Sequence, residues 1–197
     1  MFYKISERII AYAIKNNTLS RDKAEEYIYG LEISLSVLLS YFSVIIIGLL
    51  MGMLWQSLLF LLIFVSVRRF GGGFHFNSQF MCYLSMCVIC PLILLIIKYG
   101  GNNIVLYSII MTVSTLVSFI IFPVQAIEKP LDEKEKSVYG WISRIILIVI
   151  AVIYAVLCFF QKIYTAKIIS ITVFVIALFA VLGKIKLKMY GSKRAVS

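Results

Sequence analysis

The chain contains a series of long apolar segments, separated by short segments in which basic residues gather. A helix that crosses a bilayer needs roughly 17 to 25 mostly apolar residues. Segments that meet or approach this length lie at residues 33–54, 56–67, 81–97, 104–124, 145–160 and 167–182. With 62% hydrophobic and 14% charged residues, the chain has more apolar surface than one soluble core of its length could enclose. The sequence therefore predicts an all-α, polytopic integral membrane protein with about six transmembrane helices, forming one membrane domain over residues 1–197.

The second segment, 56–67, is short for a membrane span, so its length alone permits an oblique or re-entrant helix and leaves five or six crossings open. The distribution of basic residues favours six. With six crossings and a cytoplasmic N-terminus, all but three of the 19 basic residues lie on the cytoplasmic side, as the positive-inside rule requires. The exceptions are Lys98, Lys162 and Lys167. We therefore expect a multi-pass protein of a bacterial plasma membrane with both termini in the cytoplasm.

Residues 1–30 differ from the spans because their apolar residues alternate with charged ones at helical spacing. The apolar stripe of the first turns consists of Phe2, Ile5, Ile9 and Tyr12. This pattern predicts an amphipathic cytoplasmic helix along the membrane surface, and Ser20 is a candidate N-cap for the helix that leads into the first span. The charged residues leave no short apolar core of a signal peptide, so we expect the N-terminus to stay on the mature protein.

The net charge of +10 would suggest nucleic acid as a partner for a soluble protein. Here the basic residues cluster at the ends of apolar segments, where topology and anionic lipid explain them better, so we expect no nucleic-acid partner. The four cysteines lie in or beside apolar segments, which is not the pattern of an extracellular disulfide framework. We expect free thiols and no metal or other cofactor.

The residues with the strongest potential for chemistry are concentrated in the glycine-rich loop 68–80 and at the helix start that follows it. His75 is the single histidine of the chain, and Cys82 is its first cysteine. A thiol nucleophile needs a base that takes its proton, and a neutral imidazole can do this near pH 7. The sequence therefore suggests Cys82 as a nucleophile and His75 as its base.

The spacing of these two residues sets a condition on the structure. On one unbroken helix, a separation of seven residues would place them about 10.5 Å apart, which is beyond hydrogen-bond reach. The glycines at 71–73 disfavour regular helix, and Asn77 or Ser78 can cap a new helix. We therefore expect a bend that brings His75 back over a helix start, with Cys82 within about one turn of the helix N-terminus, where a thiolate is favoured.

Each of these residues also has a simpler interpretation. A lone histidine at a membrane edge is more often an interfacial or packing residue, and a cysteine among apolar neighbours packs as a small hydrophobic side chain. Cys87 and Cys90 form a C-x-x-C pattern inside an apolar span, for which we prefer a packing role. Ser85 is an alternative nucleophile, although serine on membrane helices usually donates to a nearby carbonyl.

Neighbouring residues leave further alternatives open. No carboxylate lies in the loop, so an orienting group for His75 would be Asn77, Gln79 or a residue of another segment, or the pair would act alone. Arg68 and Arg69 suit contact with anionic lipid, binding of an acidic substrate or control of topology. The nine acidic residues all lie in predicted cytoplasmic segments, which argues against an aspartyl intramembrane protease or a proton-coupled carrier.

At this loop the sequence closely resembles the accessory gene regulator B (AgrB) family, membrane endopeptidases that process autoinducing-peptide precursors in Gram-positive quorum sensing. The resemblance rests on Arg68-Arg69, the glycine step that ends at Gly73, His75, and Cys82 followed by Tyr83. A second match is Pro123 followed by Lys129-Pro130, within the predicted charged cytoplasmic loop 125–144.

The resemblance implies a cysteine peptidase in which Cys82 attacks a peptide bond of a small AgrD-like precursor and His75 acts as base and then acid. It also implies that a thiol or hydroxyl of the peptide resolves the acyl-enzyme to a thiolactone or lactone, and that the enzyme works as a homodimer. Arg68, Arg69, Gly73, Lys129 and Pro130 would position the loop or contact the substrate. The alternatives are an exporter or permease component for a small peptide, with the loop 125–144 as its docking face, and a sensor or scaffold without chemistry.

Overall fold

The computed structural model describes residues 2–16, 18–74, 78–125 and 132–194, and within these ranges the chain is helical with no β-strand. The helices are α1 (Phe2–Lys15), the short 3₁₀ helix η1 (Arg21–Lys23), α2 (Ala24–Leu50), α3 (Leu54–Gly71), α4 (Gln79–Tyr99), α5 (Ile104–Ile121), α6 (Glu133–Phe159) and α7 (Ile163–Arg194). Six of them, α2 to α7, are long and apolar enough to cross a membrane. The prediction of an all-α protein with six spans is confirmed.

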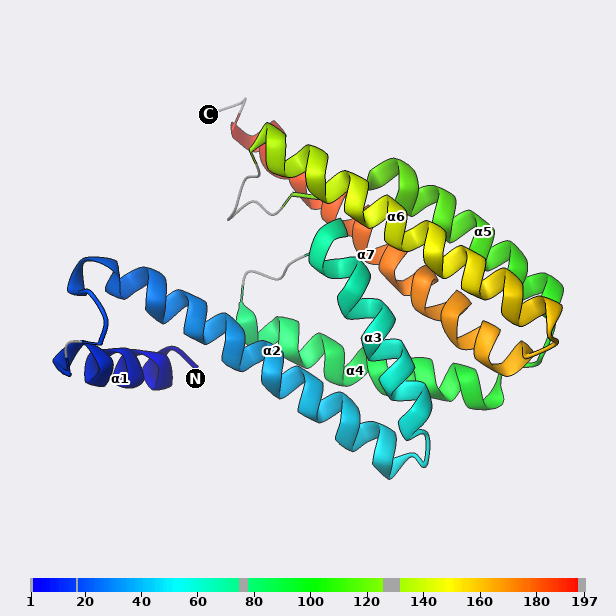
Figure 1. Cartoon of the computed structure of the whole chain (residues 1–197), viewed down its shortest axis with the longest axis horizontal. Coiled ribbons are helices and arrows are strands. Elements are labelled where there is room, and N and C mark those ends of the chain that lie inside the picture. The colour runs from blue at the N-terminus through cyan, green and yellow to red at the C-terminus, as the bar shows by residue number, and fades with distance from the viewer. Residues whose placement is uncertain (1, 17, 75–77, 126–131, 195–197) are drawn as a thin grey trace.

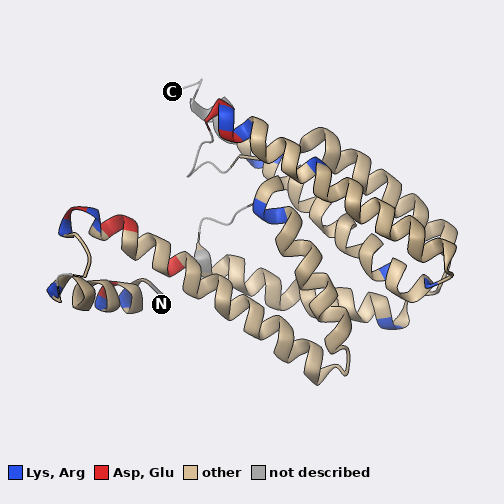
Figure 2. Ribbon diagram, in the orientation of Figure 1, with Lys and Arg blue, Asp and Glu red and all other residues tan. Residues whose placement is uncertain are grey.

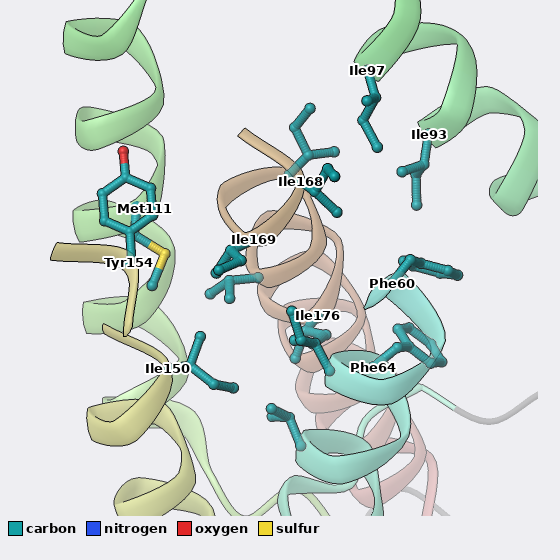
Figure 3. Close-up of a cluster of buried hydrophobic side chains, with 14 of the residues drawn as sticks. Phe60, Phe64, Ile93, Ile97, Met111, Ile150, Tyr154, Ile168, Ile169 and Ile176 are labelled. Carbon is teal, nitrogen blue, oxygen red and sulfur yellow. The ribbon is translucent and has the colours of Figure 1, made fainter. Parts of the chain in front are cut away.

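The last helix, α7, is the centre of the bundle. In its apolar part 61% of the residues are buried, against 17–33% in the other five spans. The helices α3, α5 and α6 surround it, and their buried side chains converge on Ile168, Ile169 and Ile176 of α7 (Figure 3). A helix that is apolar on all sides is expected in such a central place, because protein covers every face of it.

The helices α2 and α4 run side by side and form a second layer beside this group (Figure 1). The residues of α2 that face the interior are mostly small, namely Ser36, Ser40, Val44 and Gly48. Small side chains allow helix backbones to approach closely in membranes. The hydroxyls of Ser43 on α2 and Tyr83 on α4 form a hydrogen bond of 3.2 Å, which joins the two helices of the layer.

Two helices extend further than their apolar residues suggested. The span expected at 56–67 is α3, which covers 18 residues, because Leu54 and Trp55 before it and the residues 68–71 after it are also helical. Near its start, the Ser57 hydroxyl donates to the Leu54 carbonyl at 2.8 Å. The predicted charged loop 125–144 is helical from Glu133 onward, where the Glu135 carboxylate accepts a hydrogen bond from the Asp132 amide at 3.3 Å, half of a capping box.

The segment 1–30 is divided between two helices. The amphipathic helix α1 packs back against α2 and buries Ser6 and Ile10, while Ile5 and Ile9 of the predicted apolar stripe stay exposed. Ser20 occupies the N-cap position of η1, which leads directly into α2. Surface contact of α1 with lipid remains a prediction.

Charged residues gather at one end of the bundle, where α1, the start of α2, the end of α3 and the start of α6 lie (Figure 2). We call this the charged end, and both termini lie toward it (Figure 1). The opposite end carries Lys98, Lys162 and Lys167. Lys167 is buried there, and its ammonium group donates to the carbonyls of Ile97, at 2.8 Å, and Gly100. It thereby caps the last turn of α4.

Candidate active site at the charged end

The helix breaks between the two parts of the motif. The helix α3 ends at Gly71 and α4 begins at Gln79, with Ser78 in the N-cap position. Gly72 and Gly73 adopt φ angles of 71° and 139°, a region that L-residues rarely occupy. The expected break between the two helices is therefore present. His75 lies in the segment 75–77, outside the described residues, so its distance from Cys82 stays a prediction.

The first residues of this loop are held against two distant segments. The Val124 amide donates to the Gly71 carbonyl at 2.9 Å, and Gly72 pairs with Val124 in an isolated β-bridge. On the other side, the Phe74 amide donates to the Phe179 carbonyl of α7, also at 2.9 Å. The chain that enters 75–77 is thus fixed by the α5–α6 connection and by the central helix.

A glycine of α7 makes room for this contact. A Cβ atom at Gly183 would lie 2.7 Å from the carbonyl carbon of Gly73 and 2.8 Å from the amide nitrogen of Phe74. Cβ atoms do not come that close to backbone, so any side chain at Gly183 would push the loop away. The sequence analysis did not identify Gly183 or Phe179. The available signal was a lone glycine immediately after the apolar run of the last span.

The two arginines of the motif have different surroundings. The Arg68 guanidinium is partly buried, donates to the Phe74 carbonyl and lies 5.2 Å and 4.9 Å from the ring centroids of Phe64 and Phe179. Arg68 therefore positions the loop from the interior of the fold. From the sequence alone, contact with lipid or substrate and control of topology had all been open. Arg69 is exposed and lies over its neighbour Phe70 at 5.8 Å.

Cys82 lies in the first turn of α4, as expected. Its thiol is free and partly exposed, and its amide donates to the Ser78 carbonyl at 3.2 Å. The Cys82 amide is therefore occupied. The amides of Phe80 and Met81 come before it in the same turn, and as first-turn amides they have no acceptor within α4 itself. The Ser85 hydroxyl donates to the Cys82 carbonyl at 2.7 Å, which is the packing behaviour that the sequence had suggested for this serine.

A pocket of about 580 Å³ lies beside Cys82 and is lined by residues from both layers of the fold. Arg68 and Cys82 both line it. Its remaining walls come from α2, α3, α4, the residue Val124 and α6. Its volume is in the range of about 300–1,000 Å³ that is usual for ligand sites.

The other predicted site residues are placed as follows. Gly73 lies at the start of the loop, where its φ angle suits glycine. Lys129 and Pro130 lie in the segment 126–131, outside the described residues. Within the described ranges, no cluster of three or more histidine, cysteine, aspartate or glutamate side chains could hold a metal ion.

Two glycines with similar φ angles allow a test of the loop's fixation. Gly72 has a φ of 71° and Gly52, between α2 and α3, has a φ of 65°. A Cβ at Gly72 would overlap the Val124 carbonyl oxygen, whereas a Cβ at Gly52 has no neighbour within 4 Å. We expect Gly52→Ala to lower the free energy of unfolding in detergent by about 1–2 kcal/mol from backbone strain alone. Gly72→Ala should cost more than the roughly 1–3 kcal/mol of its own strain, because the overlap adds to it. Equal losses for the two variants would contradict the close approach.

Comparison with known proteins identifies the family. The sequence model described as accessory gene regulator B matches residues 6–182. Putative AgrB-like protein 1 of Clostridium perfringens is 26% identical over 107 residues, which are 54% of this chain and 56% of that protein, so the match spans about half of the relative's length. No solved structure matches the chain. Since the family model covers nearly the whole chain, this multi-pass membrane protein belongs to the AgrB family of the accessory gene regulator system.

Proposed function

We propose that this protein is a membrane cysteine endopeptidase that cleaves an AgrD-like autoinducing-peptide precursor through an acyl-enzyme at Cys82. The supporting observation is the position of the Cys82 thiol, which is partly exposed in the first turn of α4 and lines a pocket together with Arg68. Among the cysteines, Cys82 is the one that lies both at a helix N-terminus and in this pocket, so we assign it as the nucleophile.

In the proposed reaction, His75 takes the proton of the Cys82 thiol, and the sulfur attacks the carbonyl carbon of the peptide bond. The oxygen that gains negative charge would face the amides of the first turn of α4, with Phe80 and Met81 as candidate donors. When the C–N bond breaks, His75 returns the proton to the leaving amine, which departs with the C-terminal part of the precursor. A thiol or hydroxyl of the bound part then displaces Cys82 and closes a thiolactone or lactone ring.

The remaining parts of the proposal concern orientation and partners. The charged end would face the cytoplasm, which the distribution of basic residues favours. Lys129 and Pro130 would contact the substrate or position the loop, and Lys129 would attract an acidic part of the precursor. The active form would be a homodimer in contact with membrane lipid.

Selective alkylation tests this assignment. Cys82, Cys87 and Cys158 are all partly exposed, whereas Cys90 is buried. We expect iodoacetamide near neutral pH to modify Cys82 first, measured by mass spectrometry of digested protein. Because Cys82 lies at the charged end, access alone could favour it over Cys87, so the decisive control is His75→Ala. This variant keeps access but removes the base, and it should slow the modification of Cys82 by at least about 10-fold, a threshold set below the usual 10²–10⁴ effect of a general base. An unchanged rate would contradict the role of His75.

A further inference from the structure

The pocket beside Cys82 has both polar and apolar residues in its lining. The helix α3 ends at the charged end and α4 begins there, and the two helices contribute Arg68 and Cys82 to the pocket. Phe64 and Met86 stand four residues from Arg68 and Cys82, which is about one helical turn, or about 6 Å, deeper. Both are more than nine-tenths buried in the fold, at 5% and 8% exposure.

The wall formed by α2 consists of Val37, Ser40 and Tyr41. The Ser40 hydroxyl is already engaged with the Ser36 carbonyl at 2.8 Å, and Tyr41 adds an aromatic ring with one hydroxyl. At the mouth, Arg69 and Tyr139 come from the charged end, where water is available. A chain that enters from this end therefore meets polar groups first and then an apolar floor.

We infer that Met86 and Phe64 form a specificity subsite, which accepts an apolar side chain from the residue whose carbonyl carbon Cys82 attacks and sets the size of that side chain. This inference rests on the proposed function of Cys82. A side chain one bond away from the attacked carbonyl must lie next to the sulfur, and Phe64 and Met86 line the same pocket as Cys82. A charged side chain would lose its hydration there, while the guanidinium of Arg68 is already engaged by the Phe74 carbonyl and two aromatic rings.

Peptidyl chloromethyl ketones provide a direct probe, because the Cys82 thiolate displaces chloride and forms a stable C–S bond. Reagents that differ only in the side chain next to the reactive carbonyl would carry leucine, phenylalanine, alanine or aspartate. We expect the leucine and phenylalanine reagents to modify Cys82 at least about 10-fold faster than the alanine reagent, since filling an apolar pocket discriminates by roughly 10- to 200-fold. Equal rates, or fastest reaction with aspartate, would overturn the inference, and the second result would mark Arg68 as an anion site instead.

Substitutions of Met86 test whether this residue sets the size of the side chain that the pocket accepts. Met86→Trp should reduce the preference for leucine over alanine by about 10-fold, and Met86→Ala should shift it toward phenylalanine, so the test does not depend on one variant folding well. Met86→Leu conserves volume and should keep the wild-type ratio. Leu84→Trp is the matched control, since Leu84 lies on the same helix but is 43% exposed. A ratio that stays the same in both Met86→Trp and Met86→Ala would contradict the subsite.

The outcome can be separated from that of the proposed function. The reagents report on the pocket through labelling of Cys82 and do not require cleavage of any precursor. If the wild-type protein cleaves its precursor only when Cys82 is present, but the reagents show no side-chain preference, the subsite is wrong and the enzyme assignment stands. If Cys82 shows the preference but no precursor is cleaved, the pocket stands and the peptidase assignment fails.

Discussion

Cys82→Ala is expected to abolish cleavage of the AgrD-like precursor while the protein still inserts into the membrane. Loss of the nucleophile in a comparable hydrolase costs on the order of 10⁶-fold in turnover, so the product should fall below detection. His75→Ala should have an effect of similar size, and the double variant should be no worse than either single variant, because the two residues act as one unit. Cleavage is measured by mass spectrometry of the precursor after incubation with membranes.

Other cysteines of the same chain provide the controls for this experiment. Cys87 and Cys158 are partly exposed free thiols on membrane-spanning helices, and neither lines the pocket. Cys87→Ala and Cys158→Ala should therefore cleave at close to the wild-type rate. Cys82→Ser should also be inactive, since a hydroxyl is a far weaker nucleophile than a thiol near neutral pH. Intact cleavage by Cys82→Ala would favour a role in export or in sensing.

Arg68→Ala is expected to lower both stability and activity, although Arg68 is assigned no part in the chemical steps. The substitution removes two stacking contacts, each worth about 0.5–2 kcal/mol, and a charged hydrogen bond worth about 1.5–3 kcal/mol. We expect a loss on the order of 3 kcal/mol in the free energy of unfolding. Because the loop that leads to His75 would be released, cleavage should fall by on the order of 100-fold or more.

The neighbouring arginine makes the comparison specific. Arg69→Ala removes the same charge at an exposed position and should change stability by no more than about 0.5 kcal/mol. Arg68→Lys keeps the charge but loses the planar group that lies between two rings, so it should recover only part of the loss. Thermal unfolding in detergent and cleavage of the precursor should be measured on the same preparations. Equal effects of Arg68→Ala and Arg69→Ala would show that charge at the membrane edge, and not the buried contacts, explains the motif.

Much of the fold followed from patterns within short stretches of sequence. Apolar runs identified six spans, and the glycines at 71–73 together with Ser78 located the break between α3 and α4. The predicted ends of α3 and α6 were too short, because polar residues beside an apolar run still form helix when they are capped or buried. The Asp132-x-x-Glu135 pair is a helix-start signal that was available in the sequence, yet the region around it was interpreted as a loop.

The site itself depended on contacts that no local pattern contains. The loop docks on Phe179 and Gly183, more than one hundred residues away in the chain, and nothing in the sequence pairs these positions. The sequence left three roles open for Arg68, and only its position between Phe64 and Phe179 distinguishes it from Arg69. The pocket likewise depends on how the α2–α4 layer lies against α3 and α6.

The most direct test of the central claim is to look for the acyl-enzyme itself. A precursor in which the thiol or hydroxyl that closes the ring is replaced by alanine should be cleaved but released slowly, because only water can then resolve the thioester. After a rapid acid quench, mass spectrometry should find the N-terminal part of the precursor attached to the Cys82 sulfur and removable by hydroxylamine. Complete single-turnover cleavage with Cys82 free at every time point, or with the precursor attached to another residue, would contradict the mechanism.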